Sequence, residues 1–212
     1  MILGNPITLG GGKKKGRLPE GYRELKYIEG TGQQYINTGL FPSRNYSIKM
    51  QFQILGTSGK PAGVMNPNSW AGSYYGSEAW NGNYNLMDNR AVAYTISPFQ
   101  NIDFTIEYDY FNKKIIVDGS VVASITETIY PISTLYLFTA NMNGSPNGTA
   151  AMRLESFVAV DMSTGEQVSE LVPCADDGNS FVGVFDIERG ILIGNSGTGA
   201  FVAGPDAEQG IA

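Results

Sequence analysis

The chain has 212 residues, a formal net charge of −6, no histidine and a single cysteine, Cys174. These counts exclude histidine-based nucleophilic catalysis, histidine metal sites, cysteine zinc sites and any disulfide within the chain. Charged residues make up only 16% of the sequence, whereas glycine and aromatic residues are abundant, and this composition favours an all-β protein with many turns.

Residues 1–17 differ from the rest of the chain in charge. They contain four of the 14 basic residues and no acidic one, so residues 18–212 carry 10 basic against 20 acidic residues, a net charge of −10. Nucleic-acid phosphates need a basic surface, which an acidic body does not provide. The positive charges follow the short apolar stretch, whereas in a signal peptide they precede it, and no segment is apolar enough to span a bilayer. We therefore expect neither nucleic-acid binding nor membrane insertion.

The apolar side chains of residues 1–17 are too few to form a core of their own. We predict that this segment is an extended anchor that joins another protein, for instance by strand addition, followed by a glycine and lysine linker. The alternative is a disordered segment without a function. The predicted attachment residues are Ile2, Leu3, Ile7 and Leu9. Residues 18–212 then form one domain.

From Tyr22 onward, apolar and polar residues alternate. Residues 47–54 and 102–108 alternate strictly, which predicts strands with one buried face. Asp118-Gly119 predicts a tight hairpin between residues 115–117 and 121–125. Further strands are expected at residues 135–139, 151–160, 168–172 and 181–187. No window shows a helical apolar stripe, so we predict an all-β, two-sheet antiparallel sandwich, with the jelly roll as the leading topology.

Two stretches resemble a known family. Residues 18–39 (LPEGYRELKYIEGTGQQYINTG) closely resemble the opening of a concanavalin A-like (LamG-like) jelly-roll family that is common in phages and prophages of gut bacteria. Residues 171–174 (LVPC), 182–186 (VGVFD), 195–201 (NSGTGAF) and 203–205 (AGP) resemble its far end, and the Asp118-Gly119 hairpin is similar to that of laminin-G-type sandwiches. The resemblance implies a jelly roll whose ends meet and a virion or surface protein, and it carries over no catalytic residue.

Aromatic and amide side chains alternate between residues 70 and 84, where both tryptophans of the chain lie. Sugars stack on aromatic rings while amides bind their hydroxyl groups, so this loop-rich stretch is the candidate carbohydrate-binding site. The alternative is that the tryptophans fill the core or a subunit interface. The predicted carbohydrate-binding residues are Trp70, Tyr74, Tyr75, Trp80, Asn81 and Tyr84.

Sandwiches of this family include glycoside hydrolases, whose two catalytic carboxylates lie on one face of a strand. The nearest match is Glu107-Tyr108-Asp109, where Asn112 replaces the last glutamate of the glucanase pattern Glu-x-Asp-x-x-Glu. We therefore interpret Glu107 and Asp109 as solvent-facing residues of an edge or outer strand, and expect no enzyme.

Calcium assists many lectins of this kind and is bound by several loop oxygens. The candidate loops are Asp176-Asp177-Gly178-Asn179 and Asp88-Asn89. Turn hydrogen bonds explain both equally well, so we expect no cofactor and no metal site. Cys174 is interpreted as a buried small apolar residue.

These observations lead us to expect a bacteriophage virion protein, such as a capsid head fibre, decoration protein or tail appendage. Its lectin-like domain would adhere to host or mucosal glycans through many weak contacts. We expect attachment to other virion proteins through the N-terminus, a homo-oligomer such as a trimer, synthesis in the bacterial cytoplasm and release by lysis. The alternatives are a structural capsid decoration protein that binds no sugar and, third, a glycoside hydrolase.

Overall fold

The computed structural model describes residues 7–8, 17–65, 74–88, 91–126 and 133–207. Every regular element among these residues is a β-strand. A search of the same residues for a helix able to cross a membrane finds none.

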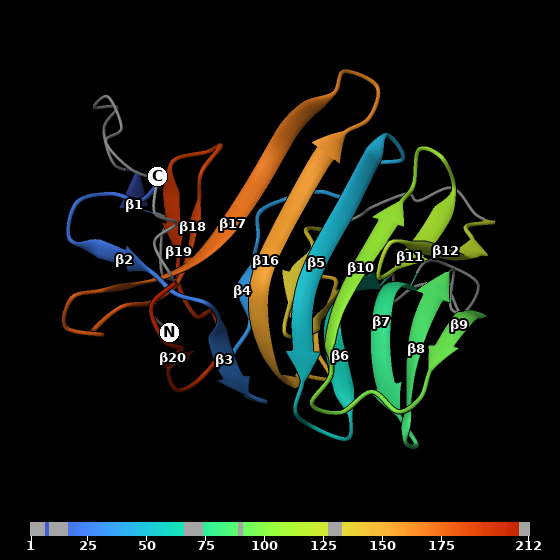
Figure 1. The fold of residues 1–212 in the computed structure, drawn as a ribbon, viewed down its shortest axis with the longest axis horizontal. Helices are drawn as coiled ribbons and strands as arrows, with labels where there is room; N and C mark the ends of the chain where they lie inside the picture. Colours follow the sequence, from blue (N-terminus) through green and yellow to red (C-terminus); the bar gives the residue numbers. More distant parts are fainter. Residues whose placement is uncertain (1–6, 9–16, 66–73, 89–90, 127–132, 208–212) are drawn as a thin grey trace.

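The strands form two sheets packed face to face (Figure 1). The larger sheet runs β1-β19-β18-β17-β16-β5-β10-β11-β12, and β2, β3 and β20 join it beside this path. Its strands are β1 (Ile7–Thr8), β2 (Tyr22–Glu24), β3 (Ile28–Thr31), β5 (Tyr46–Ile54), β10 (Asp103–Asp109), β11 (Lys114–Val117), β12 (Ser120–Ser124), β16 (Ala151–Asp161), β17 (Glu166–Asp176), β18 (Val182–Asp186), β19 (Ile191–Ile193) and β20 (Val202–Ala203).

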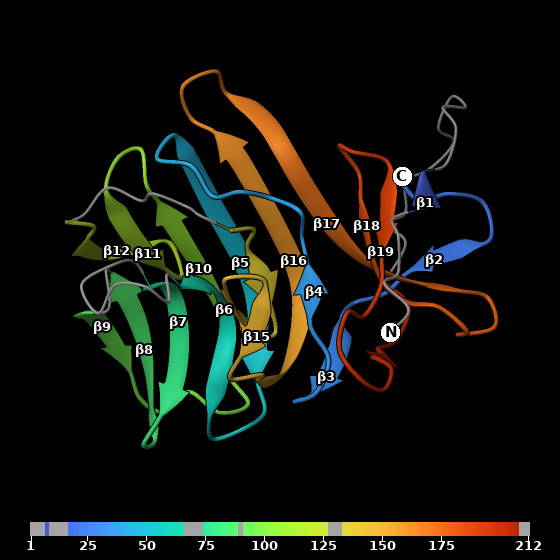
Figure 2. The same cartoon turned by 180° about the vertical axis from the view of Figure 1, so that it is seen from behind.

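The smaller sheet runs β15-β14-β6-β7-β8-β9, and β13 joins it together with β4. It is the nearer sheet in Figure 2. Its strands are β4 (Ile36–Asn37), β6 (Gly59–Met65), β7 (Tyr74–Trp80), β8 (Asn83–Asp88), β9 (Ala91–Ile96), β13 (Tyr136–Leu137), β14 (Ala140–Met142) and β15 (Ser145–Asn147). Among the described residues, all pairings between these strands are antiparallel except that of β14 with β6. The predicted all-β, two-sheet sandwich is confirmed.

The core lies between the sheets. On β5, the inward residues from Ile48 to Ile54 are buried while Lys49 and Gln51 are exposed, which is the predicted alternation. The Phe52 ring of the larger sheet packs 5.9 Å from the Tyr84 ring of the smaller sheet, measured between centroids. Close aromatic packing of this kind joins the two layers.

The predicted Asp118-Gly119 hairpin joins β11 to β12. Asp118 has φ 47° and Gly119 has φ 79°, and two consecutive residues of positive φ are what a two-residue hairpin loop requires. Within residues 70–84, the stretch expected to be rich in loops, the described part from residue 74 onward instead forms β7, a short turn and the start of β8. The loop-rich description is therefore wrong for this part of the chain.

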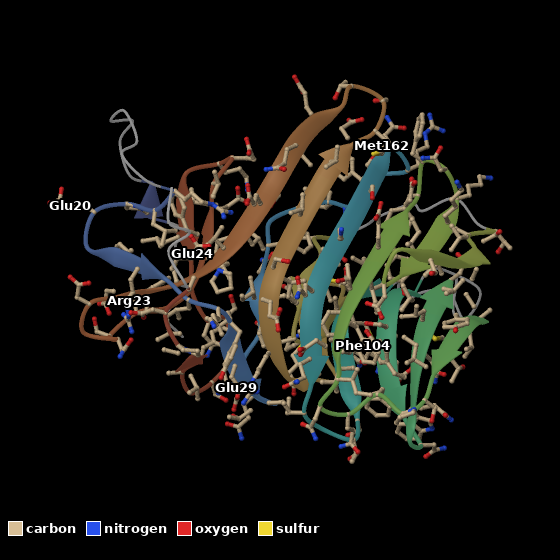
Figure 3. The ribbon with its side chains drawn as sticks, viewed as in Figure 1. Glu20, Arg23, Glu24, Glu29, Phe104 and Met162 are labelled. Carbon is tan, nitrogen blue, oxygen red and sulfur yellow. The ribbon has the colours of Figure 1, made fainter. Side chains whose placement is uncertain are left out.

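A smaller lobe, formed by β2, β3, β18, β19 and β20, extends from the larger sheet on the left of Figure 1. The first half of β17 pairs with β16 and its end pairs with β2. The two ends of the domain meet here, because Leu25 forms a bridge with Asp206 and the Arg23 guanidinium lies 2.7 Å from the Asp206 carboxylate. Figure 3 labels Arg23 on this lobe.

Cys174 lies in the core of the lobe, against Phe185 and Leu192. Its side chain is fully buried, and mainly for this reason its thiol pKa is raised to about 12. The interpretation of Cys174 as a buried apolar residue is confirmed.

Candidate functional site

The structure describes only some of the residues in the candidate carbohydrate-binding stretch, and these lie in different elements. Trp70 lies outside the described residues, and of Tyr74 and Tyr75 only the backbone, at the start of β7, is described. Trp80 ends β7, Asn81 lies in the following turn, and Tyr84 lies on β8. The structure therefore tests the last three residues.

Tyr84 is a core residue, so its predicted role in sugar binding is wrong. Its ring is fully buried, and its centroid lies 6.1 Å from those of Phe99 and Phe104. Burial raises the pKa of its hydroxyl far above the usual value. The alternation of Asn83, Tyr84, Asn85 and Leu86 explains the placement, because residues two apart on a strand share a face and Leu86 is also buried.

Trp80 has the opposite environment. Its side chain is 58% exposed, while the preceding residue, Ala79, is fully buried, so Trp80 lies on the outer face of the smaller sheet. The core alternative for this tryptophan is wrong. Asn81, with φ 51°, and Gly82, with φ 75°, form the tight turn that carries the chain from β7 into β8. A turn this short holds Trp80 opposite Asn83, its register partner.

Polar side chains surround Trp80 on the same sheet face. Asn83 is exposed, and among the described residues neither its amide nor that of Asn81 has a hydrogen-bond partner. Asn85 lies two residues after Asn83 on β8, and its Oδ1 atom accepts a hydrogen bond of 2.9 Å from the Thr95 hydroxyl on β9. We name this group the Trp80 face and define it as Trp80, Asn81, Asn83, Asn85 and Thr95.

The Trp80 face is bordered by charges. Glu78 lies opposite Asn85 in the register of β7 and β8, and its carboxylate is 3.2 Å from the Lys60 ammonium group. Asn85, Thr95, Glu78 and Lys60 were not predicted as part of the site. The two-residue period of the strands indicates which side chains share a face. It identifies these residues as neighbours of Trp80 only when the strands that lie side by side are known.

The two carboxylates of β10 each accept hydrogen bonds from neighbouring side chains. Glu107 accepts a hydrogen bond from the Ser47 hydroxyl at 2.6 Å. Asp109 is only 5% exposed, and its two oxygens accept from the Asn112 backbone amide at 2.9 Å and its side-chain amide at 2.7 Å. The interpretation of Asp109 as solvent-facing is wrong, because β10 lies between β5 and β11 and the carboxylate closes the turn at its end.

Hydrogen bonds within the turn occupy the first calcium candidate loop. The Asp176 carboxylate accepts from the Ser180 hydroxyl and, at 3.2 Å, from the Phe181 amide, and these bonds lower the pKa of Asp176. The Arg23 guanidinium donates to the Asp176 carbonyl and to Asn179 Oδ1, both at 2.6 Å. A cationic side chain thus already lies against this loop.

The second candidate loop provides one described carboxylate. Asp88 Oδ2 accepts from the backbone amide and the hydroxyl of Thr126, both at 2.7 Å, while Asn89 lies outside the described residues. In the part of the chain that the structure covers, no three Cys, Asp or Glu side chains are gathered in a metal-binding arrangement.

The outer face of the larger sheet carries a row of polar side chains that bind one another. Arg153 Nε donates to Glu29 at 2.8 Å, Arg153 Nη1 donates to Gln53 at 3.0 Å, and Gln53 donates to Asp103 at 3.0 Å. The Tyr27 ring lies 4.6 Å from the guanidinium carbon of Arg153. Figure 3 labels Glu29 at the β3 end of this row. These groups are paired, unlike the side-chain amides of Asn81 and Asn83.

The N-terminal segment contributes one described strand. Ile7 pairs with Leu192 of β19 in the same chain, and Ile2, Leu3 and Leu9 lie outside the described residues. Strand pairing by this segment is therefore seen within the chain, and pairing with another protein stays a prediction.

Comparisons with known proteins assign no family to the chain. No protein-family model matches it, and no curated protein matches it. The arguments on function below therefore start from the Trp80 face and from the sequence itself.

Proposed function

We propose that this protein binds carbohydrate through the Trp80 face and displays this site on the surface of a bacteriophage particle. The observation that carries the binding proposal is the exposed Trp80 ring beside two amides without partners. A large aromatic ring left in water forgoes the free energy of burial, about 1.5–3 kcal/mol for a large apolar side chain. Stacking against the C–H face of a sugar ring recovers part of that free energy.

The polar neighbours suit the same ligand. Exposed amides at Asn81 and Asn83 can each donate to and accept from sugar hydroxyl groups. Asn81 lies in a two-residue turn and Asn83 directly follows it, so these residues lose little conformational freedom on binding. An open sheet face with one ring predicts weak binding at a single site, which becomes useful when many copies act together.

The virion part of the proposal rests on the sequence. Residues 18–39 and the motifs at 171–174, 182–186, 195–201 and 203–205 resemble the LamG-like jelly-roll family of phages, which also supports a jelly-roll topology for the sandwich. In this proposal residues 1–17 attach the domain to other virion proteins, and the protein is released when the host is lysed. Deleting residues 1–17 is expected to abolish incorporation into particles while the domain stays folded, and continued incorporation would exclude the anchor.

The binding proposal is tested on a glycan array with the full chain displayed in multivalent form. Trp80→Ala is expected to weaken binding at least roughly tenfold, as for an aromatic residue at the centre of an interface. Asn83→Ala should weaken it less. Phe111→Ala is the matched control, because Phe111 is 48% exposed but lies in the turn after β10. No glycan bound at high avidity, or equal losses with Trp80→Ala and Phe111→Ala, would exclude the proposal.

A structural decoration protein that binds no sugar is the second candidate. The observation that favours it is the presence of exposed large apolar residues away from the Trp80 face, among them Phe41 at 55%. Such residues suit contacts with other proteins as well. This candidate predicts that particles carrying the protein resist heating better than particles without it, and that Trp80→Ala leaves this protection unchanged.

A further inference from the structure

Asparagine is followed directly by glycine at three places in the chain, and all three lie within the described residues: Asn81-Gly82, Asn143-Gly144 and Asn147-Gly148. The backbone nitrogen of such a glycine can attack the asparagine side chain, because glycine has no side chain to hinder the approach. We propose that Asn81 is the position at which the folded protein deamidates, and that this modification converts the Trp80 face from an uncharged into a negatively charged surface.

The reaction needs only water. The Gly82 backbone nitrogen loses its proton to hydroxide or water and attacks Cγ of Asn81, so that a new N–Cγ bond forms. The Cγ–Nδ2 bond breaks, and Nδ2 takes up a proton and leaves as ammonia. Water then opens the cyclic imide at either of its carbonyl carbons. One opening leaves an aspartate, and the other leaves an isoaspartate, whose backbone runs through the side-chain carbon; nothing is oxidised or reduced.

The turn between β7 and β8 leaves both reacting groups free. It lies at the lower ends of these strands in Figure 1. Asn81 and Gly82 are exposed, and within the described residues neither the Asn81 side-chain amide nor the Gly82 backbone amide takes part in a hydrogen bond. A Cβ added at Gly82 would meet no atom within 4 Å, so there is room for the cyclic imide.

The turn between β14 and β15 has a similar backbone but holds its glycine in place. Asn143 and Gly144 have φ 52° and 87°, against 51° and 75° in the turn between β7 and β8. Gly144 donates its backbone N–H to Asn141 Oδ1 at 2.7 Å, and the Asn141 side-chain amide donates to the Thr134 carbonyl at 2.7 Å. The bond to Asn141 must break before the Gly144 nitrogen can lose its proton and attack Asn143.

The third pair is held by contacts of both residues. Asn147 is half-buried at the end of β15, and its Nδ2 donates to Met142 Sδ at 3.8 Å. The Gly148 carbonyl accepts from the Lys60 backbone amide at 2.6 Å. These contacts restrict the rotation that would bring the Asn147 side chain against the Gly148 nitrogen. Asn81-Gly82 is therefore the pair whose reacting groups meet the least resistance.

Either product changes the Trp80 face. An aspartate at position 81 adds a negative charge to residues 18–212, which already carry −10, and removes an amide donor for sugar hydroxyl groups. An isoaspartate lengthens the backbone of a two-residue turn and disturbs the register of Trp80 with Asn83. Deamidation itself does not depend on sugar binding, and only its effect on binding rests on the proposed function.

The test is peptide mapping by mass spectrometry of the full chain, kept in mildly alkaline buffer either folded or unfolded in urea. Incubation continues until the unfolded protein has reacted at all three pairs, which shows that the conditions suffice. In the folded protein, Asn81 is expected to react about fivefold or more faster than Asn143, because one net hydrogen bond slows a step by about this factor. In urea the three rates should become similar, because the turns are lost.

Two variants sharpen the comparison. Asn81→Gln should nearly abolish the reaction at position 81, because the longer side chain closes a cyclic imide less readily, and should leave Asn143 and Asn147 unchanged. Asn141→Ala frees the Gly144 amide and should raise the rate at Asn143, and circular dichroism verifies that this variant is folded. If it is not, the wild-type rates decide. Equal rates at all three positions of the folded protein, or a faster reaction at Asn143 or Asn147, would overturn the proposal.

The effect on the Trp80 face is measured separately. Ion exchange isolates the fraction that has gained a negative charge, and peptide mapping identifies the part modified at position 81. This fraction is expected to lose binding on the glycan array relative to unmodified protein, and equal binding would refute the effect on the Trp80 face. If fresh protein binds no glycan, the proposed function fails while the deamidation rates still decide whether Asn81 is the modified position.

Discussion

Replacing Tyr84 by alanine separates the core from the Trp80 face. The Tyr84 ring is fully buried and lies 5.9 Å from the Phe52 ring and 6.1 Å from those of Phe99 and Phe104. Truncating a buried aromatic residue to alanine costs about 3–5 kcal/mol of unfolding free energy. For a chain of this length each kcal/mol corresponds to about 2–4 °C in Tm, so Tyr84→Ala should lower Tm by about 6–20 °C.

The assay is thermal and urea unfolding followed by circular dichroism. Trp80→Ala, four positions away, is the control, and its unfolding free energy should stay within about 0.5 kcal/mol of the wild type because the side chain is 58% exposed. In glycan binding the order is reversed, because Trp80→Ala is then the variant expected to be defective. An unchanged Tm for Tyr84→Ala would refute the assignment of Tyr84 to the core.

Two further predictions concern buried positions. Gly76→Ala should destabilise the protein by about 2 kcal/mol or more, because Gly76 has φ +148° and a Cβ there would lie 2.1 Å from the Ala62 carbonyl oxygen. Gly82→Ala, with no atom within 4 Å of the added Cβ, should cost less in the same urea titration, and equal costs would contradict the steric argument. Cys174 should react with a thiol reagent at pH 8 only after urea unfolding, because its thiol pKa of about 12 leaves almost no thiolate. Since that pKa is raised above its ordinary value of 9.0, the stability that the buried thiol contributes is present below about pH 9 and is lost as the pH rises toward 12. Rapid labelling of the native protein would contradict the burial of Cys174.

Several parts of the fold could be predicted from local patterns. The alternation on β5 and β10 identified strands with one buried face, and Asp118-Gly119 identified a hairpin because both residues adopt positive φ. Of the strands of the smaller sheet, only β13 lies within a predicted strand, that of residues 135–139. Around β7, the many glycine, serine and asparagine residues are typical of loops, and pairing with β6 and β8 outweighs that tendency.

The candidate site was likewise predictable only in part from the sequence. The cluster of aromatic and amide residues was visible in the chain, but proximity in sequence placed Trp80 and Tyr84 in one group. On adjacent strands they face opposite sides of the sheet, so one ring meets water and the other meets Phe52. Asp109 was misjudged for a similar reason, because whether its strand is an edge or lies inside the sheet depends on distant partners.

The sequence by itself therefore determined the strand period, the tight turns, the absence of histidine chemistry and the acidic character of residues 18–212. These properties depend on side-chain chemistry and on backbone conformations of neighbouring residues. The tertiary structure decided which face of β8 is covered, which ring stays exposed on the Trp80 face, and that β9 and β12 lie side by side. Those outcomes depend on pairing between segments far apart in the chain, which no local pattern encodes.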